Sequence, residues 1–166
     1  MDSCRQSEPD LKTVRTRNFS MTVPTTWRYC PRKGVDSEVG MFVTEKQDTI
    51  FYDYGLYSDP LNEDYIILNY ERIKDIQGLE FDAPVYFSAN PEVDRRNGKY
   101  SQQVILKDTI DNLPVKIVRQ KKGKHGITGV HFERTKGVNK LTIQAENLDS
   151  IAEMRLLESF NTINFK

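Results

Sequence analysis

The chain has 166 residues, of which 37% are hydrophobic and 29% are charged, and its 24 basic residues balance 24 acidic ones. This length is typical of a single globular domain, and the lack of any long uncharged apolar run argues against membrane-spanning helices. The eight Phe, eight Tyr and single Trp argue against a disordered chain. The sequence also lacks the repeats that are typical of fibrous proteins.

The N-terminal residues 1–12 are polar and predict a flexible tether, which leaves residues 13–166 as one folded domain. Cys4 follows the small residue Ser3, and this pair resembles the start of a mature bacterial lipoprotein, where such a cysteine carries lipid. Met1 and Asp2 do not fit the apolar pair that precedes a lipidated cysteine. An ordinary cytosolic N-terminus and a disulfide between Cys4 and Cys30 are the alternatives.

The first half of the domain predicts three strands. Residues 18–23 alternate apolar and polar side chains, as a half-buried strand does. Trp27, the only tryptophan, is expected to fill one end of the core. The runs at 38–44 and 49–57 are the next strands, and the short polar connection between them predicts a hairpin. Because both faces of 49–57 are largely apolar, we expect this strand to be central and covered on two sides.

The middle of the chain is less regular. Residues 62–77 fit both a helix and a strand, and apolar residues that recur at i, i+4 and i+7 favour the helix. Residues 85–87 predict a short strand. Residues 88–99, which contain Pro, Asn and Gly, predict a loop.

The second half predicts a run of strands that ends in an antiparallel meander. These strands are centred on residues 104–106, 115–117, 128–132 and 141–145. A helix follows, because Ser150 and Glu153 have the spacing of a capping box and the next residues carry an apolar stripe. Residues 163–165 are expected to return to a sheet edge. The chain is therefore predicted to be α+β, with a mostly antiparallel sheet and a C-terminal helix packed on it.

Two motifs resemble a known group of proteins. Gly34-Val35-Asp36-Ser37-Glu38-Val39-Gly40 and Asp53-Tyr54-Gly55-Leu56-Tyr57-Ser58 resemble the signature of uncharacterised, lipoprotein-like proteins of the bacterial cell envelope. The block from Lys121 to Gly129 also resembles theirs. This resemblance supports Cys4 as a lipid anchor and export to the cell envelope, with the cytoplasm as the alternative. It implies no activity.

A more distant resemblance concerns the fold. The first predicted strand ends at Val23-Pro24, a tryptophan follows three residues later, and the chain closes with a helix. This order is similar to that of PsbP-like proteins. The resemblance implies a layered α+β architecture.

Charge is segregated along the chain. Residues 36–94 hold three basic and fourteen acidic residues, whereas residues 107–140 hold nine basic and three acidic ones. We expect the acidic and basic strands to neutralise each other across the sheet. A dipolar molecule with a basic face is the alternative. Because the whole chain is not basic, nucleic acid is not an expected partner.

The sequence offers few catalytic or metal-binding groups. His125 and His131 are both expected on the surface, and no Cys, His and carboxylate cluster has metal-ligand spacing. Asp59, Glu63 and Asp64 match no calcium loop, so they are interpreted as a solvated turn. We therefore predict no metal and no cofactor.

The candidate binding residues are Asp53, Tyr54, Tyr57 and Ser58 in the strand-end motif, and Lys121, Lys122 and Lys124 in a basic hairpin tip that could form a phosphate nest. Asp53 stands out because it is a carboxylate inside an apolar strand. Burial of a carboxylate without a partner is costly. Asp53 is therefore either held by hydrogen bonds from the loop at 36–37 or backbone amides, or placed in a cleft to bind a ligand.

These features favour a non-enzymatic binding or accessory domain of the cell envelope, with a protein or glycan partner. One alternative is a hydrolase with Asp53 as general base beside Tyr54 or Ser58. Another is a cytosolic protein-partner module, by analogy with PsbP-like proteins. We expect a monomer that meets a membrane only through lipid on Cys4.

Overall fold

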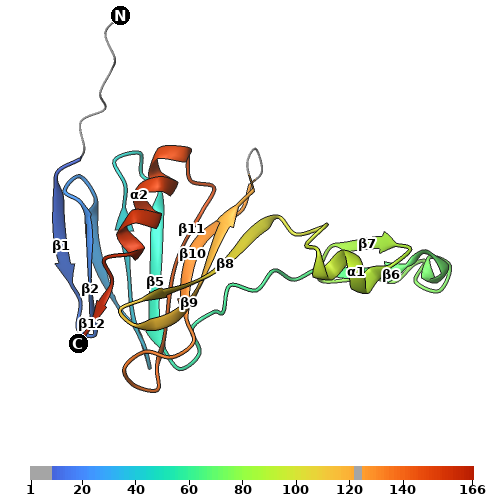
Figure 1. Ribbon diagram of the computed structural model, residues 1–166, viewed down its shortest axis with the longest axis horizontal. Helices are drawn as coiled ribbons and strands as arrows, with labels where there is room; N and C mark the ends of the chain where they lie inside the picture. Colours follow the sequence, from blue (N-terminus) through green and yellow to red (C-terminus); the bar gives the residue numbers. More distant parts are fainter. Residues whose placement is uncertain (1–8, 122–124) are drawn as a thin grey trace, which may run out of the picture.

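The computed structural model describes residues 9–121 and 125–166. Figure 1 shows a layered body from which an arm projects. The largest layer is a seven-stranded antiparallel sheet. In sheet order its strands are β3 (Arg28–Lys33), β4 (Glu38–Val43), β5 (Thr49–Gly55), β11 (Lys140–Glu146), β10 (Ile127–Phe132), β9 (Leu113–Gln120) and β8 (Gln103–Ile110).

A three-stranded sheet and a helix cover one face of the large sheet (Figure 1). The small sheet has the order β1 (Leu11–Arg15), β2 (Phe19–Pro24) and β12 (Asn164–Phe165). The helix is α2 (Ser150–Phe160). The predicted α+β class, the antiparallel meander, the hairpin of β4 and β5, and the C-terminal helix with its returning strand are all confirmed.

One hydrophobic core joins the two sheets and α2. Phe19 of β2 meets Tyr52 of β5 edge-to-face, with ring centroids 5.3 Å apart. Phe165 of β12 packs in the same manner on Phe132 of β10 at 5.0 Å. Trp27 is fully buried in this core, as predicted. These aromatic contacts hold the N- and C-terminal strands against the inner face of the large sheet.

The cap of α2 differs from the predicted one. Asp149 is the N-cap, and its Oδ1 accepts from the backbone N–H groups of Ile151 and Ala152 at 3.0 and 2.8 Å. Glu153, the expected partner in a capping box, instead accepts from the Thr128 hydroxyl at 2.9 Å. The helix is therefore pinned to β10 by Glu153 as well as by its apolar residues.

The prediction of a helix over 62–77 is wrong. This stretch contains strand β6 (Ile66–Asn69) and a single 3-10 turn, η1 (Tyr70–Arg72). Strand β7 (Val85–Ser88) pairs with β6 in parallel, and the predicted loop that follows contains helix α1 (Pro91–Arg96). Proline at the first helical turn is a helix-start signal, so α1 could have been found in the sequence.

These middle elements form the arm, which we define as residues 62–102 (Figure 1). Tyr86 stacks on Tyr100 with centroids 4.6 Å apart and meets Tyr65 edge-to-face at 6.1 Å. At the base of the arm, Glu63 accepts from the Ser101 hydroxyl at 2.5 Å and from the Gln102 backbone N–H at 2.6 Å. Aromatic stacking and this carboxylate clip replace the expected helix.

Strand β5 is central in the sheet but is covered on one side only. Ile50, Tyr52 and Tyr54 are buried, whereas the Phe51 side chain is 52% exposed. The expectation of two covered faces is therefore wrong. The apolar residues on the second face of β5 have another role, because they border a cavity.

The charge segregation is not resolved by ion pairs across the sheet. None of the ion pairs found within 9–121 and 125–166 joins the acidic segment 36–94 to the basic segment 107–140. Lys136 and Lys140, for example, pair with Asp111 and Glu133 of their own segment. The predicted neutralisation is therefore not found in this part of the chain.

Strand β1 begins at Leu11, so its first two residues belong to the segment 1–12 that was predicted as a tether. Lys12 donates to the Thr25 carbonyl at 3.0 Å. The candidate lipid site Cys4 lies outside the described residues, as does its pairing with Cys30. Over the described ranges, no helix combines the length and apolar character that a bilayer crossing requires.

Leu156 tests the layering of helix on sheet. Its side chain is fully buried, so Leu156→Ala is expected to lower the free energy of unfolding by about 2–5 kcal/mol. Met154 on the same helix is half exposed, and Met154→Ala is expected to cost less than about 0.5 kcal/mol. Denaturant unfolding of both variants measures these costs. Equal small costs would contradict the packing of α2 on the core.

Candidate functional site

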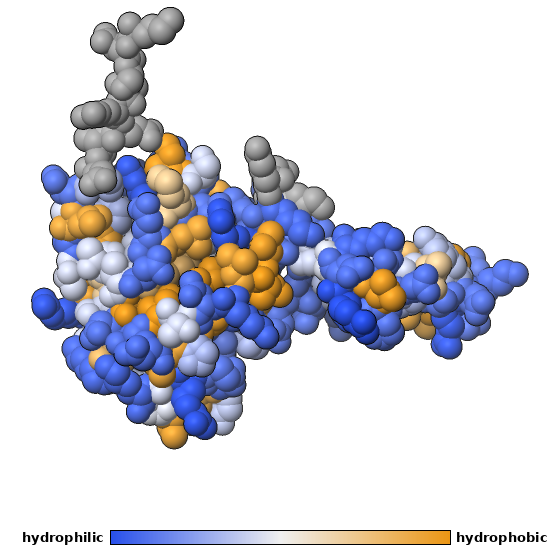
Figure 2. Space-filling model, in the orientation of Figure 1, coloured by the Kyte–Doolittle hydropathy of each residue, from blue (hydrophilic) through white to orange (hydrophobic). Residues whose placement is uncertain are grey.

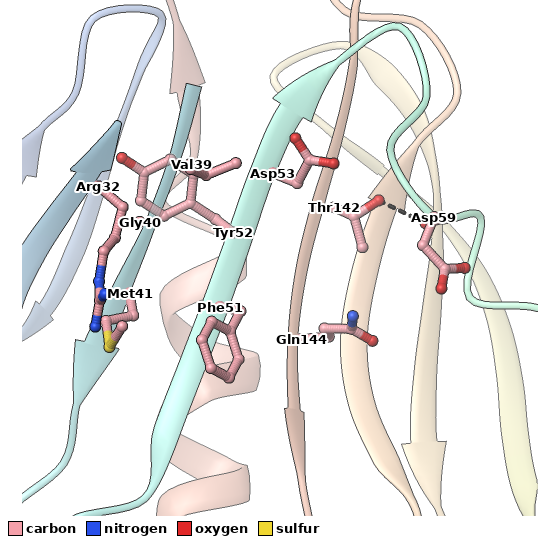
Figure 3. Close-up of a pocket in the computed structure, with 10 residues that line it drawn as sticks. All are labelled: Arg32, Val39, Gly40, Met41, Phe51, Tyr52, Asp53, Asp59, Thr142 and Gln144. Carbon is pink, nitrogen blue, oxygen red and sulfur yellow. Dashed lines mark hydrogen bonds between the residues drawn. The ribbon is translucent and has the colours of Figure 1, made fainter. Parts of the chain in front are cut away.

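A cavity of about 550 Å³ opens on the outer face of the large sheet, opposite the core. Figure 3 shows the side chains that line it, which come from β3, β4, β5, β11 and the segment after β5. They are Arg32, Val39, Gly40, Met41, Phe51, Tyr52, Asp53, Asp59, Thr142 and Gln144. The cavity is thus built on regular strands, with one wall from a connecting segment.

The register of the sheet arranges the floor of the cavity in two rows. In one row, Val39 is paired with Arg32 on one side and with Asp53 on the other, and Asp53 is paired with Thr142. In the neighbouring row, Phe51 lies between Met41 and Gln144. Directly opposed residues of antiparallel strands face the same side. The floor therefore has an apolar part on β4 and β5 and a polar part on β5 and β11.

Gly40 and Tyr52 shape the floor from beneath. A Cβ atom on Gly40 would lie 2.5 Å from the Tyr52 ring, so only glycine leaves room for this ring. The Tyr52 hydroxyl is 2.9 Å from that of Tyr29. Burial, followed by this hydrogen bond, raises the pKa of Tyr52 well above its usual range. Tyr52 is therefore neutral at physiological pH, and its ring supports the floor of the cavity.

Asp53 has the most unusual environment in the cavity. Its Oδ1 is buried and has no hydrogen-bond partner among the described residues. Figure 3 shows the carboxyl group between Val39 and Thr142. The hydrogen bonds from the 36–37 loop or backbone amides that a purely structural role requires are not found in this part of the chain. Buried polar atoms are normally satisfied, so Asp53 is an acceptor that lacks its donor.

Thr142 on β11 fixes the wall that the segment after β5 contributes to the cavity, opposite β3. Its hydroxyl donates to the Asp59 carbonyl at 2.6 Å, and Oγ1 is 2.8 Å from Nδ1 of His131 (Figure 3 shows the first bond). Lys116 on β9 donates to Asn62 Oδ1 at 3.0 Å, and burial lowers the pKa of this lysine. The segment from Asp59 to Asn62 is thus tied to β11 and β9.

His131 is buried, contrary to the expected surface position, because the segment 59–62 covers the outer face of β10. Nδ1 of His131 lies 2.8 Å from Oγ1 of Thr142, and Nε2 lies 2.9 Å from a carboxylate oxygen of Glu133. His131 therefore links β11 to the segment after β10 through both ring nitrogens. His125, in contrast, is exposed as predicted.

The predicted site residues are not assembled into one place. Asp53 lines the cavity, whereas Tyr54 points to the core and lies 3.2 Å from the Thr135 hydroxyl. Tyr57 is 85% exposed. Ser58 is buried, donates to the Asp53 carbonyl and accepts from the Gly55 N–H. The Asp53, Tyr54 and Ser58 side chains of the hydrolase hypothesis therefore do not face a common space.

Of the basic hairpin tip, only Lys121 is described, and it does not line this cavity. Lys121 donates to the Gly98 carbonyl at 3.1 Å, at the base of the arm. Lys122 and Lys124 lie outside the described residues. The acidic triplet is also dispersed, since Asp59 accepts from the Leu61 N–H and Glu63 forms the arm clip. No group of metal-binding side chains is found in the described ranges.

Sequence reasoning missed most of the cavity. Val39, Met41 and Phe51 were identifiable as one face of a hairpin, because alternation places them together. Arg32, Thr142 and Asp59 carry no such signal. Arg32 approaches Asp53 through the pairing of β3 with β4 and of β4 with β5. Thr142 approaches Asp53 through the pairing of β5 with β11, which are distant in sequence, and Asp59 accepts a hydrogen bond from Thr142.

A scan against models of known protein families found no match, and a search of curated proteins found no relative.

Thr142→Val tests the wall of the cavity. The substitution leaves Nδ1 of His131 and the Asp59 carbonyl without a partner, so the free energy of unfolding should fall by about 1–3 kcal/mol. Gln144→Ala is the control, because Gln144 lines the same cavity without a side-chain hydrogen bond in the described residues; its cost should stay below about 0.5 kcal/mol. A similar cost for both variants in denaturant unfolding would contradict the role of Thr142.

Glu133 gives a pH prediction. Its hydrogen bonds with Lys140, then with His131, lower its pKa from 4.5 to about 2. A lowered folded-state pKa contributes stability that is present above pH 4.5 and is lost as the pH falls toward 2. Wild type should therefore melt above Glu133→Gln at pH 6, and the difference in melting temperature should disappear by about pH 2. A difference that does not change with pH would contradict this pairing.

Proposed function

We propose that the chain is a non-enzymatic binding domain, and that its ligand is an apolar group with a cationic or hydrogen-bond-donating end that enters the outer-face cavity. The observation that carries this proposal is the carboxyl group of Asp53, which lines the cavity and forms no side-chain hydrogen bond within the described residues. A ligand that donates to this carboxyl group from the cavity would offset the cost of its partial burial.

The lining of the cavity supports this ligand chemistry. Val39, Met41 and Phe51 form an apolar floor, and Phe51 is half exposed to solvent. A ligand that covers Phe51 removes apolar surface from water, at about 25 cal/mol per Å². Binding sites of this type combine a mainly apolar lining with a few placed polar groups.

The charges of the cavity favour a cation at the Asp53 end. Asp53 and Asp59 contribute two carboxylates on one side, and Arg32 lies across the cavity on β3 (Figure 3). Hydrogen bonds between an ammonium or guanidinium group and a carboxylate are about twice as strong as neutral ones. Arg32 would meet the opposite end of a longer ligand, such as a carboxylate or carbonyl group. An amine on an apolar body, including the side chain or terminus of a peptide, meets these requirements.

The cellular setting belongs to the same proposal. The two sequence motifs resemble those of bacterial envelope proteins, and we place the domain in the cell envelope as a binding or accessory module on that basis. A PsbP-like relationship, which rests on the order of the first strand, the tryptophan and the C-terminal helix in the sequence, is part of the same proposal. Binding of a protein or glycan through exposed amines would suit this setting.

Asp53→Asn tests the proposal. Because the side chain of Asp53 forms no hydrogen bond in the described residues, the variant should melt at the wild-type temperature or above it. Binding is measured by NMR titration with benzylammonium as the probe and benzyl alcohol as its neutral counterpart. Wild type should bind benzylammonium with a Kd on the order of 1 mM and benzyl alcohol about tenfold more weakly. Asp53→Asn should remove this preference.

Asp82→Asn, an exposed carboxylate of the arm, is the matched control and should bind both probes like wild type. Signals that shift should be those of Val39, Met41 and Phe51. A strong loss of stability in Asp53→Asn would show a structural role for the carboxylate. Shifts confined to other regions would exclude the cavity as the site.

A further inference from the structure

Strand β8 leaves one edge of the large sheet open within the described residues. It pairs with β9 alone, and the six residues between its ends are exposed. Val104, Ile105 and Leu106 form an apolar run along this strand, and Ile105 is 53% exposed. Figure 2 shows hydrophobic surface on the side of the molecule that faces the viewer, where β8 runs in Figure 1. Exposed edge strands are usually blunted by proline or several charges, whereas β8 has only Lys107 and Asp108.

The hairpin of β8 and β9 determines which backbone groups are free. Its two turn residues, Asp111 and Asn112, have φ values of 49° and 61°, as a two-residue type I′ turn requires. Ile110 and Leu113 flank this turn and form the first hydrogen-bonded pair. The alternation of an antiparallel ladder then directs the N–H and C=O groups of Gln103, Ile105, Lys107 and Thr109 to the free edge.

We propose that β8 pairs with β8 of a second copy of this chain, antiparallel, about a two-fold axis at Ile105. A two-fold axis perpendicular to the sheet keeps each side chain on its own face, so the paired residue numbers have an even sum. With the axis at Ile105, Ile105 faces itself and Val104 faces Leu106 of the second copy. The apolar run thus covers itself, and two seven-stranded sheets become continuous.

Other registers are less favourable. An axis at Lys107 would place two lysines opposite each other, and like charges in that position destabilise a sheet. An axis at Leu106 would oppose Ile105 to Lys107 and Val104 to Asp108. Only the axis at Ile105 pairs apolar residues with apolar residues across the whole run.

The polar residues fit the same register. Lys107 of the second copy lies opposite Gln103, a neutral residue that is only 8% exposed. No like charges therefore oppose each other at this position.

Charges at the end of the strand are also complementary. A cavity of about 560 Å³ lies between β8 and the arm, and Arg95, Arg96 and Lys121 are among the residues that line it. Asp108 of the second copy lies opposite Gln102, which stands between two lining residues of this cavity, Ser101 and Gln103. Glu63, the carboxylate already in the cavity, is occupied by Ser101 and Gln102. Each copy thus brings an acidic side chain near the basic lining of the other.

Sedimentation measures the association. Wild type should form a dimer at concentrations on the order of 100 µM, in contrast to the monomer expected from the sequence. Ile105→Lys should weaken this association at least about tenfold without a change in melting temperature, since the side chain is exposed. Ile73→Lys, a half-exposed position on the arm, should associate like wild type. A monomeric wild type would overturn the proposal and leave the edge to a strand of another protein.

Cysteine cross-linking tests the register in a Cys4→Ser, Cys30→Ser background. Ile105→Cys should form a disulfide-linked dimer on mild oxidation, because paired Cα atoms are about 5.5 Å apart. Lys107→Cys should not, because its two copies are offset by four residues, or about 13 Å. Cross-linking of Lys107→Cys in place of Ile105→Cys would overturn the register. A dimer that persists in Ile105→Lys would overturn the interface. Neither outcome bears on the outer-face cavity, which is formed by β3, β4, β5 and β11.

Discussion

The large sheet packs on the hydrophobic core through one face only, and this constraint determines where everything else lies. On β5, Ile50 and Tyr52 point into the core while Phe51 and Asp53 point away from it. Helix α2 and the small sheet cover the inner face, whereas the outer face receives only the connecting segment after β5. A two-residue period leaves no other place for the odd-numbered residues of β5. The cavity is the part of that outer face that the connecting segment leaves open.

The two sequence motifs meet in space, although they are separate in the chain. Gly40 lies beneath the ring of Tyr52, and a Cβ on Gly55 would lie 2.7 Å from that of Ser37. The glycines therefore allow β4, β5 and the preceding loop to approach closely. The motif residues mainly shape the frame, and the side chains open to a ligand are their neighbours Val39, Met41 and Phe51 together with Asp53.

Local patterns were sufficient for the strands that alternate regularly. The strands around Phe19, Met41, Ile50 and Ile143 could be predicted because apolar side chains recur every second residue. The stretch at 62–77 could not, because Tyr65 and its neighbours are organised by Tyr86 and Tyr100, which lie far along the chain. The same limit applies to the site. Asp53 was identifiable as a charge within an apolar strand, but its neighbours across β11 depend on a register that no local pattern encodes.

The pairing of β12 with β2 has a consequence for folding during synthesis on the ribosome. Phe165 is opposite Phe19 and Thr142 is opposite Asp53, so each of these two later strands is synthesised long after the strand with which it pairs. Contacts between residues so distant in sequence form slowly, since a long loop must close before they are made. The core cannot be completed while residue 165 is still within the ribosome. Until then the apolar faces of β2 and β5 lack some of the residues that cover them, and apolar surface exposed in this way is prone to associate with other chains.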